Sequence, residues 1–363
     1  MHLNSLSCNN YRNLTSMELF FNDKVNIFVG NNGQGKTNLL EAIYFLSLTK
    51  SFKTNKLADI IAFDKNEFFL SASLIKSDYP YQIEVDFDKY KKHIKINNNS
   101  ESKFKDVIGL LNAVLFVPED LQLLKGNPKL RRRLFDIELS KLYPKYLLNL
   151  SSYYQVMKQR NSYLKTQTID NLVLDSLDMQ LAKFGEVIAE FRIEFMSELT
   201  ELTNHFYQTI SGSEDVIRLV YQSQIKKDNL SFYDNLKKAC ERDSILQQTT
   251  VGIHRDDFIA YINNKDASEY ASQGEQRTIV LAIKLALVEY IFLKTKEYPI
   301  LLLDDVMSEL DVNRQENLIK YLNMKVQTFI TTTNINNLNS DIVKEAKLFE
   351  INKGIVKEAG ING

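Results

Sequence analysis

The amino-acid sequence predicts an α/β fold in which a mixed sheet with helices is assembled from both ends of the chain and carries an inserted α-helical arm. The first third alternates strand-like and helical stretches, the middle repeats apolar residues at helical spacing, and the last third returns to strands and helices. The expected limits are residues 1–120 for the first part of the α/β body, 121–245 for the helical arm and 246–363 for the second part of the body.

Strands and one helix are expected in the first third. Strand-like stretches lie at residues 2–9, 24–29, 68–74 and 81–87. A helix is expected over residues 38–48. The lysine-rich segment 89–96 runs into three asparagines, which favour turns, and it therefore indicates a hairpin or an edge strand. A small antiparallel region is thus expected beside the first strand–helix unit.

The middle of the chain, from about residue 121 to residue 240, has a helical pattern. Its longest apolar stripe recurs at steps of three and four, at Leu174, Leu177, Leu181, Phe184, Ile188, Phe191, Phe195, Leu199, Leu202 and Phe206. At ~1.5 Å per residue, a helix over this stripe is roughly 50 Å long. A second stripe supplies a partner helix, with Tyr146, Leu150, Tyr153, Met157 and Leu164. We expect a two-helix arm.

The last third is expected to contain a long helix after Gln273 and strands at residues 300–303 and 328–331. Both strands are apolar and of ordinary strand length. Together with the strands of the first third, they would complete one sheet built from both chain ends.

Composition and charge narrow the class of protein. The chain has 363 residues and a formal net charge of −1, so nucleic-acid binding has to come from local patches or from a surface built by two copies. The two cysteines, Cys8 and Cys240, fit a reducing compartment and argue against a disulfide framework or a zinc site. Because the sequence shows neither a signal peptide nor a membrane-spanning run, a cytoplasmic location is expected.

The clearest chemical motif follows the strand expected at residues 24–29. Positions 30–37 read Gly-Asn-Asn-Gly-Gln-Gly-Lys-Thr and match the phosphate-loop (Walker A) pattern, with a helix after them. Glycines let the backbone wrap around phosphates, whose charge is neutralised by amides, by the helix N-terminus and by Lys36. Thr37 is expected to offer its hydroxyl to Mg²⁺. The predicted ATP contacts are Gly30, Asn31, Asn32, Gly33, Gln34, Gly35, Lys36, Thr37 and Asn38.

Two carboxylates end the strand expected at residues 300–303. An apolar strand followed by Asp304 and Asp305 is the Walker B arrangement that holds Mg²⁺ beside a phosphate loop. Asp304 is expected to bind the metal through water, and Asp305 to orient or deprotonate the attacking water. The predicted catalytic residues are therefore Asp305 and Lys36, the predicted metal ligands are Thr37 and Asp304, and slow ATP hydrolysis is expected.

A third motif separates ABC-type ATPase heads from other phosphate-loop proteins. Ser272, Gly274 and Gln276 belong to a Ser-x-Gly-x-Gln segment that directly precedes a long helix. In ABC-type ATPases such a segment gives its hydroxyl, amides and helix dipole to the γ-phosphate held by the opposite subunit. Taken alone, such a segment is more often an ordinary helix N-cap. Its place about 30 residues before the acidic strand, and the D-loop-like residues 308–311, favour an ABC-type head with these three contacts made in trans.

Longer stretches resemble the RecF family of bacterial DNA-gap repair proteins, which are ABC-type ATPases with SMC-like heads. The sequence stretches that resemble the family are residues 10–13, 30–42, 51–54, 116–121, 125–126, 132–136, 159–161, 252–257 and 270–278. The resemblance implies a homodimer that ATP closes on duplex DNA or duplex/single-strand junctions, with single strands bound more weakly, and that hydrolysis reopens. It also implies cooperation with RecO and RecR in gap repair and RecA loading, within DNA replication and the SOS response to DNA damage.

Departures from the family pattern bear on the site. The family usually has Pro at the position of Ile253, Gln at that of Glu275 and often Arg at that of Lys53, and many ABC ATPases have Glu where Asp305 stands. Glu275 adds a carboxylate near the γ-phosphate of the partner site, which would weaken ATP-driven dimerisation. Gln122 is a candidate for the Q-loop glutamine.

Three basic groups are candidate DNA contacts: Lys50 with Lys53, Lys91 with Lys92 in the hairpin, and Arg132 with Arg133 at the start of the arm. Several cations on one face suit sequence-independent binding of phosphates. A solvated charged face would carry the same residues, so both interpretations stay open for each group. For His254 and Arg255, which lie beside two aspartates, an internal ion pair competes with a ligand contact.

Three other functions share part of this pattern. A transporter nucleotide-binding subunit would have a signature closer to Leu-Ser-Gly-Gly-Gln, and the arm argues against it. A phosphate-loop kinase of small molecules would explain residues 30–37 and leave residues 272–276 unexplained. A chromosome-maintenance head would use the arm as a tether, with hydrolysis incidental.

Overall fold

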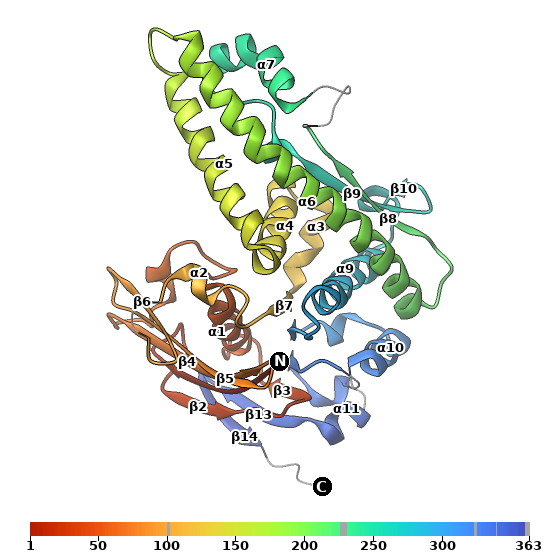
Figure 1. The fold of residues 1–363 in the computed structure, drawn as a ribbon. Coiled ribbons are helices and arrows are strands. Elements are labelled where there is room, and N and C mark those ends of the chain that lie inside the picture. Colours follow the sequence, from red (N-terminus) through yellow and green to blue (C-terminus); the bar gives the residue numbers. More distant parts are fainter. Residues whose placement is uncertain (100–101, 226–230, 323–324, 339, 360–363) are drawn as a thin grey trace. The chain divides into compact units, whose positions relative to one another are not determined.

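The computed structural model describes residues 1–99, 102–225, 231–322, 325–338 and 340–359 (Figure 1). The chain divides into two compact units: unit 1 comprises residues 1–120, 209–212 and 284–363, and unit 2 comprises residues 121–208 and 213–283. Residues 246–283, which were expected in the second part of the α/β body, pack within unit 2. The predicted α/β class with a long helical segment is confirmed. Within the described ranges, no helix combines the length and apolar character needed to cross a membrane.

Unit 1 contains a six-stranded sheet in the order β14-β13-β3-β12-β11-β7. Its strands are β14 (Ile355–Ala359), β13 (Lys347–Asn352), β3 (Val25–Val29), β12 (Thr328–Thr332), β11 (Ile300–Asp304) and β7 (Ala113–Phe116). All neighbours are parallel except β13 and β14. The register places Asp304 opposite Thr331 and Val29 opposite Thr332, so the carboxyl ends of β3, β11 and β12 meet at one edge. Ligands of open α/β sheets bind at such an edge.

A second sheet of unit 1 is antiparallel, in the order β2-β1-β4-β5-β6. Its strands are β2 (Met17–Phe20), β1 (His2–Asn9), β4 (Phe68–Lys76), β5 (Tyr79–Phe87) and β6 (Lys92–Ile96). Buried apolar and more exposed residues alternate along β4, as expected for a sheet with one face on the core. The predicted hairpin is confirmed, with Phe87 of β5 opposite Lys92 of β6.

The helices of unit 1 are mostly short apart from α1 (Lys36–Leu48), which is buried along most of its length. The others are η1 (Leu57–Ile60), α2 (Phe104–Val107), η2 (Pro118–Leu121), η4 (Met307–Glu309), α10 (Val312–Leu322), η5 (Ile335–Asn337) and α11 (Ser340–Glu345). Because α1 buries apolar residues on nearly every side, it is a central helix of its unit and holds the loop before it in place.

Unit 2 is largely helical. Its helices are α3 (Gln122–Lys125), α4 (Pro128–Leu142), α5 (Pro144–Tyr163), α6 (Asn171–Ser211), α7 (Phe232–Leu246), η3 (Ile253–Arg255), α8 (Ala267–Tyr270) and the first half of α9 (Gln273–Thr295). The second half of α9 and the last residues of α6, from 209 on, belong to unit 1. The predicted long helix is α6, with 41 residues. Its buried stripe includes Leu174, Leu181, Ile188, Phe195, Leu199 and Phe206.

One expectation for the middle of the chain was wrong, because residues between 121 and 240 are not all helical. Ile217–Gln222 form strand β8, which pairs antiparallel with β9 (Asp257–Ile262), and β9 pairs with β10 (Lys265–Asp266). Buried Ile217 and Leu219 flank exposed Arg218, the two-residue period of a half-buried strand. The partner strand lies some 40 residues further along the chain, so local spacing gave no sign of the pairing.

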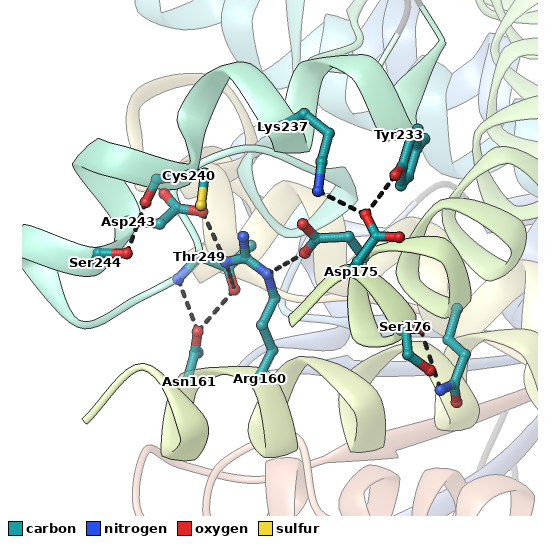
Figure 2. A network of polar contacts seen from close by, with 12 residues as sticks. Arg160, Asn161, Asp175, Ser176, Tyr233, Lys237, Cys240, Asp243, Ser244 and Thr249 are labelled. Carbon is teal, nitrogen blue, oxygen red and sulfur yellow. Dashed lines mark hydrogen bonds and ion pairs between the residues drawn. The ribbon is translucent and has the colours of Figure 1, made fainter. Parts of the chain in front are cut away.

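A buried ion-pair network joins the helices of unit 2 (Figure 2). Arg160 of α5 pairs with Asp178 of α6 at 2.6 Å and with Asp243 of α7 at 2.7 Å, and all three side chains are fully buried. The Arg160 guanidinium also donates to the Thr249 hydroxyl at 3.1 Å. Burial raises the pKa of Asp178, and the charge of Arg160 opposes this. One guanidinium therefore ties three helices and the loop after α7 together.

Arg160→Met is expected to lower the free energy of unfolding by about 3–5 kcal/mol, because it leaves two buried carboxylates without their counter-charge. Denaturant titration followed by circular dichroism measures the change. Lys237→Met is the matched control: Lys237 pairs with Asp175 at the surface (Figure 2), where solvent screens the pair. Equally small effects of the two substitutions would contradict the role given to Arg160.

Candidate nucleotide-binding site

The phosphate-loop motif forms the turn between β3 and α1 in unit 1. Gly33 and Gly35 have φ angles of +79° and +116°, in the left-handed region that favours glycine. Gly30 lies so close to β13 that a Cβ there would be 2.4 Å from the carbonyl oxygen of Ile351. Since the N-cap residue of α1 is Gly35, it has no side chain to cover the first backbone amides of the helix. Those amides suit an anion.

The Lys36 side chain folds back over the loop. Its ammonium donates hydrogen bonds to the carbonyl oxygens of Gly30 and Asn31, the latter at 3.1 Å. Burial lowers the pKa of Lys36, while the carboxylates of Asp305 and Asp304 act in the opposite direction. The cation is therefore held at the loop, within electrostatic reach of the acidic strand end, where it can neutralise a phosphate.

Asp304 ends β11 and is 5% exposed. Its carboxylate accepts a hydrogen bond from the hydroxyl of Thr331 at 2.7 Å, and the hydroxyl of Thr37 is near enough to lower its pKa. Burial raises the pKa of Asp304, and the two hydroxyls lower it. The structure thus brings the two predicted metal ligands together. A hydroxyl and a carboxylate fit Mg²⁺, which takes few protein ligands and completes its shell with water and phosphate oxygens.

Asp305, the predicted base, has a φ of +54°, which is uncommon for a residue other than glycine. Its backbone N–H donates to the Thr331 hydroxyl at 2.9 Å, and its carbonyl oxygen accepts from the Ser308 hydroxyl at 2.7 Å. Its Oδ1 is buried and has no hydrogen-bond partner among the described residues. A buried, uncommitted carboxylate oxygen beside a phosphate loop is suited to receive a proton or a water molecule.

Three residues outside the phosphate-loop motif hold the loop in place. The Asn13 side chain donates to the Gln34 carbonyl oxygen at 3.2 Å and accepts from Asn38 at 2.8 Å. On the other side, the backbone N–H groups of Lys353 and Gly354, in the turn after β13, donate to Gln34 at 2.6 and 2.9 Å. The predicted contacts Asn31, Asn32 and Gly33 are exposed on the same loop.

Lys53, a candidate DNA contact, lies beside α1, the helix that follows the phosphate loop. Its ammonium donates to the Asn38 side chain at 2.8 Å and is 3.9 Å from the buried carboxylate of Glu41. Burial lowers the pKa of Lys53, and the charges of Glu41 and Asp304 oppose this. Arg12 makes two hydrogen bonds to the same Glu41 carboxylate, at 2.8 and 3.0 Å. Lys50 is exposed just after α1.

The signature segment lies in unit 2, where it opens α9. The Ser272 N–H donates to the Glu275 carboxylate at 2.7 Å, and the Glu275 N–H donates to the Ser272 hydroxyl at 3.3 Å. This reciprocal pair is a capping box, which stabilises the start of a helix. The Ser272 hydroxyl accepts in this pair and keeps its proton for another acceptor, while the Glu275 carboxylate already occupies one donor of the helix end.

Gln276, expected to contact nucleotide in trans, is 4% exposed. Its side-chain amide donates to the carbonyl oxygens of Ala267, Ser268 and Ala271, at 3.1, 3.3 and 2.9 Å. The Gly274 carbonyl oxygen accepts from the Thr278 hydroxyl at 2.8 Å. The Gln276 side chain therefore anchors the segment to the chain before it, and its amide hydrogens are already used.

The arginines that open α4 have different surroundings. Arg131 is buried and makes two hydrogen bonds to Asp257, at 2.6 and 2.7 Å. Arg132 is half-buried and donates to the Asp256 carbonyl oxygen at 2.7 Å. Arg133 is exposed. Of the two candidate DNA contacts in this group, Arg133 is the one presented to solvent.

Residues 252–257 form a structural centre of unit 2. Asp256 is fully buried; its carboxylate pairs with Arg192 at 3.1 Å and accepts from the Gln224 N–H at 2.7 Å. Burial lowers the pKa of His254 to about 4, and its ring contacts the Tyr153 hydroxyl at 2.9 Å. The two aspartates are thus paired internally with arginines, while Arg255 is exposed.

The hairpin lysines also differ. Lys92 is half-buried, its ammonium donates to the carbonyl and hydroxyl oxygens of Thr49 at 3.1 and 2.9 Å, and burial lowers its pKa. Lys89 donates to Asn66 at 2.6 Å, and Lys95 is 3.7 Å from Glu84. Lys91 is exposed. The hairpin therefore presents Lys91 to solvent and uses Lys92 to fasten the sheet to the end of α1.

Comparison with known families and proteins gives matches that extend over nearly the whole chain. Residues 2–357 match the family described as the RecF/RecN/SMC N terminal domain. The chain is 42% identical over 365 residues to the DNA replication and repair protein RecF of Streptococcus suis strain 05ZYH33, covering 99% of this chain and 100% of that protein. It is 41% identical over 369 residues to RecF of Streptococcus pneumoniae strain ATCC 700669, covering 100% of both.

Solved structures agree with these matches. A structure of the recombination mediator protein RecF with ATP, in the RecFOR pathway, superimposes with a TM-score of 0.91 at 33% identity, over 99% of this chain and 98% of that one. An SMC head bound to the C-terminal winged-helix domain of ScpA superimposes with a TM-score of 0.58 at 14% identity, over 100% of this chain and 98% of that one. The second match shows the shared fold alone.

Proposed function

Because the chain belongs to the RecF family of DNA replication and repair proteins, we propose that it is a weak ATPase and that ATP closes a homodimer of it on DNA. The DNA is a duplex or a duplex/single-strand junction, and hydrolysis releases it without chemistry on the DNA itself. The observation that carries the proposal is the convergence, at one edge of the sheet, of the phosphate loop after β3, with Lys36 over its carbonyl oxygens, and of Asp304 at the end of β11. A solved relative with ATP supports the choice of nucleotide.

Each residue at this edge of the sheet has a role in the proposal. The backbone amides from Gly33 to Asn38 and the Lys36 ammonium bind the β- and γ-phosphates. Thr37 and Asp304 would hold Mg²⁺, which supplies charge neutralisation at the phosphates when bound. Asp305, through its uncommitted Oδ1, orients or deprotonates the attacking water. Its side chain is shorter than Glu, so slow turnover is expected.

Dimerisation completes the site in this proposal. The Ser272 hydroxyl and the Gly274 backbone of one subunit reach the γ-phosphate held by the other, and Gln276 holds their segment in shape. At an ATP concentration ~100 times the dissociation constant, binding contributes about 2.7 kcal/mol per site toward the state that holds nucleotide. Two sites per dimer double this bias.

For DNA contacts, we propose first the candidates whose side chains are exposed to solvent. Lys50, Lys53, Lys91 and Arg133 are exposed, whereas Lys92 and Arg132 are half-buried. Because DNA phosphates approach from solvent, the first phosphate contacts assigned are those four exposed cations. The proposed cellular context is the cytoplasm, where the protein would act with RecO and RecR in gap repair and RecA loading; a solved relative belongs to the RecFOR pathway.

Sedimentation velocity with and without ATP and Mg²⁺, repeated with a short duplex that bears a single-strand tail, tests the proposal. We expect ATP to convert monomer to dimer and the dimer to take up DNA. Ser272→Arg is expected to keep monomer ATP affinity within about threefold and to reduce ATP-driven dimer at least tenfold, because the larger cation blocks the helix end that meets the partner's phosphate.

Ser308→Arg is not a suitable control for this experiment, because Ser308 supports Asp305. Arg218→Ser is suitable, since Arg218 is exposed on β8 and is assigned no role. An ATP-dependent dimer that persists in Ser272→Arg would contradict the composite site. A wild-type protein that binds ATP, stays monomeric and ignores DNA would remove the RecF-like function and direct the search to a phosphate acceptor.

A further inference from the structure

Thr331 links the two carboxylates that follow one another at the end of β11. It lies on the neighbouring strand β12, opposite Asp304, and is fully buried. Its hydroxyl donates to Asp304 Oδ1 at 2.7 Å and accepts from the Asp305 backbone N–H at 2.9 Å. One hydroxyl therefore bonds both acidic residues: it donates a hydrogen bond to the Asp304 carboxylate and accepts one from the Asp305 backbone.

Asp305 depends on such contacts because its backbone is held at a φ of +54°. Residues other than glycine keep this conformation where the surrounding structure determines it. Two hydroxyls do so here, Thr331 at the N–H and Ser308 at the carbonyl oxygen. In contrast, the Asp305 Oδ1 has no hydrogen-bond partner among the described residues, so the backbone has a large part in setting the direction of this carboxylate.

We propose that Thr331 is a positioning residue that sets the spacing between the metal-side carboxylate of Asp304 and the base Asp305. The inference rests on the proposed function and deepens it. Thr37 and Asp304 would hold Mg²⁺ in the proposed function, and a hydroxyl that binds the metal would not be available to fix the Asp304 carboxylate. The Thr331 hydroxyl, which donates to Asp304 at 2.7 Å, would supply that fixed contact.

The side chain of threonine allows a test in which packing and positioning give opposite results. Thr331→Val keeps the volume and the β-branched shape and removes the hydroxyl, whereas Thr331→Ser keeps the hydroxyl and removes a methyl group. If Thr331 positions the carboxylates, Val lowers kcat for ATP about 10- to 100-fold with KM within about threefold, and Ser stays within about threefold of wild type. If Thr331 serves packing, Ser is the more damaging substitution.

A Mg²⁺ titration of the binding of a fluorescent ATP analogue supplies a readout besides turnover. Thr331→Val is expected to need about tenfold more Mg²⁺ for half-maximal binding, and Thr331→Ser about the same as wild type. Thr328→Val is the matched control: Thr328 is fully buried in the same strand, and its hydroxyl donates to the Val326 carbonyl oxygen at 3.0 Å. We expect this control to match wild type in both measurements.

Thermal unfolding is measured for each variant to check that it is folded. Should Thr331→Val not fold, Thr331→Ser and Thr331→Ala form a second pair, because they differ by one oxygen atom. Wild-type behaviour of Val in both measurements, or equal impairment of Val and Ser, would overturn the role of Thr331. A wild-type protein that binds the analogue with Mg²⁺ but does not hydrolyse ATP would count against the proposed function, and the Mg²⁺ titration would still decide on Thr331.

Discussion

Asp305→Asn is expected to keep ATP bound and to lower turnover by about 10²-fold or more, because the amide has the shape of the carboxylate and cannot accept a proton at neutral pH. The substituted chain should then accumulate as a closed, ATP-loaded dimer. Single-turnover hydrolysis and sedimentation velocity in ATP and Mg²⁺ measure the two effects on one sample.

The geometry makes this a demanding test of Asp305. Its N–H and carbonyl groups are fixed by Thr331 and Ser308, so the amide should adopt the same backbone position. Asp23→Asn is the matched control, since Asp23 is exposed before β3, at the end of that strand away from the phosphate loop. Turnover that is unchanged in Asp305→Asn would show that the base lies elsewhere.

Local spacing predicted most of the elements that carry the site. The strand ending at Val29, the loop and helix α1 all came from a pattern within 25 consecutive residues, where strand, glycines and helix follow one another. Helix α6 was equally accessible, because its apolar stripe repeats at three and four over its whole length. Such features depend on residues close in sequence, and so one sequence suffices to find them.

Pairings between distant segments were not accessible. β8 pairs with β9, and Thr331 meets Asp304 and Asp305 across two strands, without any local sign of either contact. The backbone N–H of Gly354 donates to the Gln34 carbonyl oxygen, although the two residues are more than 300 positions apart in the sequence. In the sequence, Thr331 is one of several threonines in a predicted strand. Only the register of β11 with β12 places it beside Asp304.

Charged residues showed a further limit of the sequence. Lys91 and Lys92 are neighbours in the chain, as are Arg132 and Arg133, yet Lys91 and Arg133 are exposed whereas Lys92 and Arg132 are half-buried. A signal did exist for Glu275. It stands three residues after Ser272, the spacing of a capping box, and the structure confirms that reciprocal contact.

Lys36→Ala is expected to lower ATP affinity at least about 10²-fold, because each hydrogen bond from an ammonium to a phosphate contributes about 1.5–3 kcal/mol. A second effect comes from the acidic strand end. The charge of Lys36 interacts with both Asp304 and Asp305, so its loss leaves less positive charge to offset the repulsion between these carboxylates and the incoming phosphates. Fluorescence titration with an ATP analogue and Mg²⁺ measures the change.

The fold should survive this substitution, since the ammonium bonds carbonyl oxygens of its own loop and belongs to neither buried ion-pair network of unit 2. Lys24→Ala is the matched control: it removes the same charge before β3, where Lys24 pairs with Glu345 at 3.2 Å and its side chain is 56% exposed. We expect the control to bind nucleotide as wild type does. Because the loop amides remain in Lys36→Ala, retained affinity would mean that they and not the cation dominate binding, and the catalytic role given to Lys36 would fail with it.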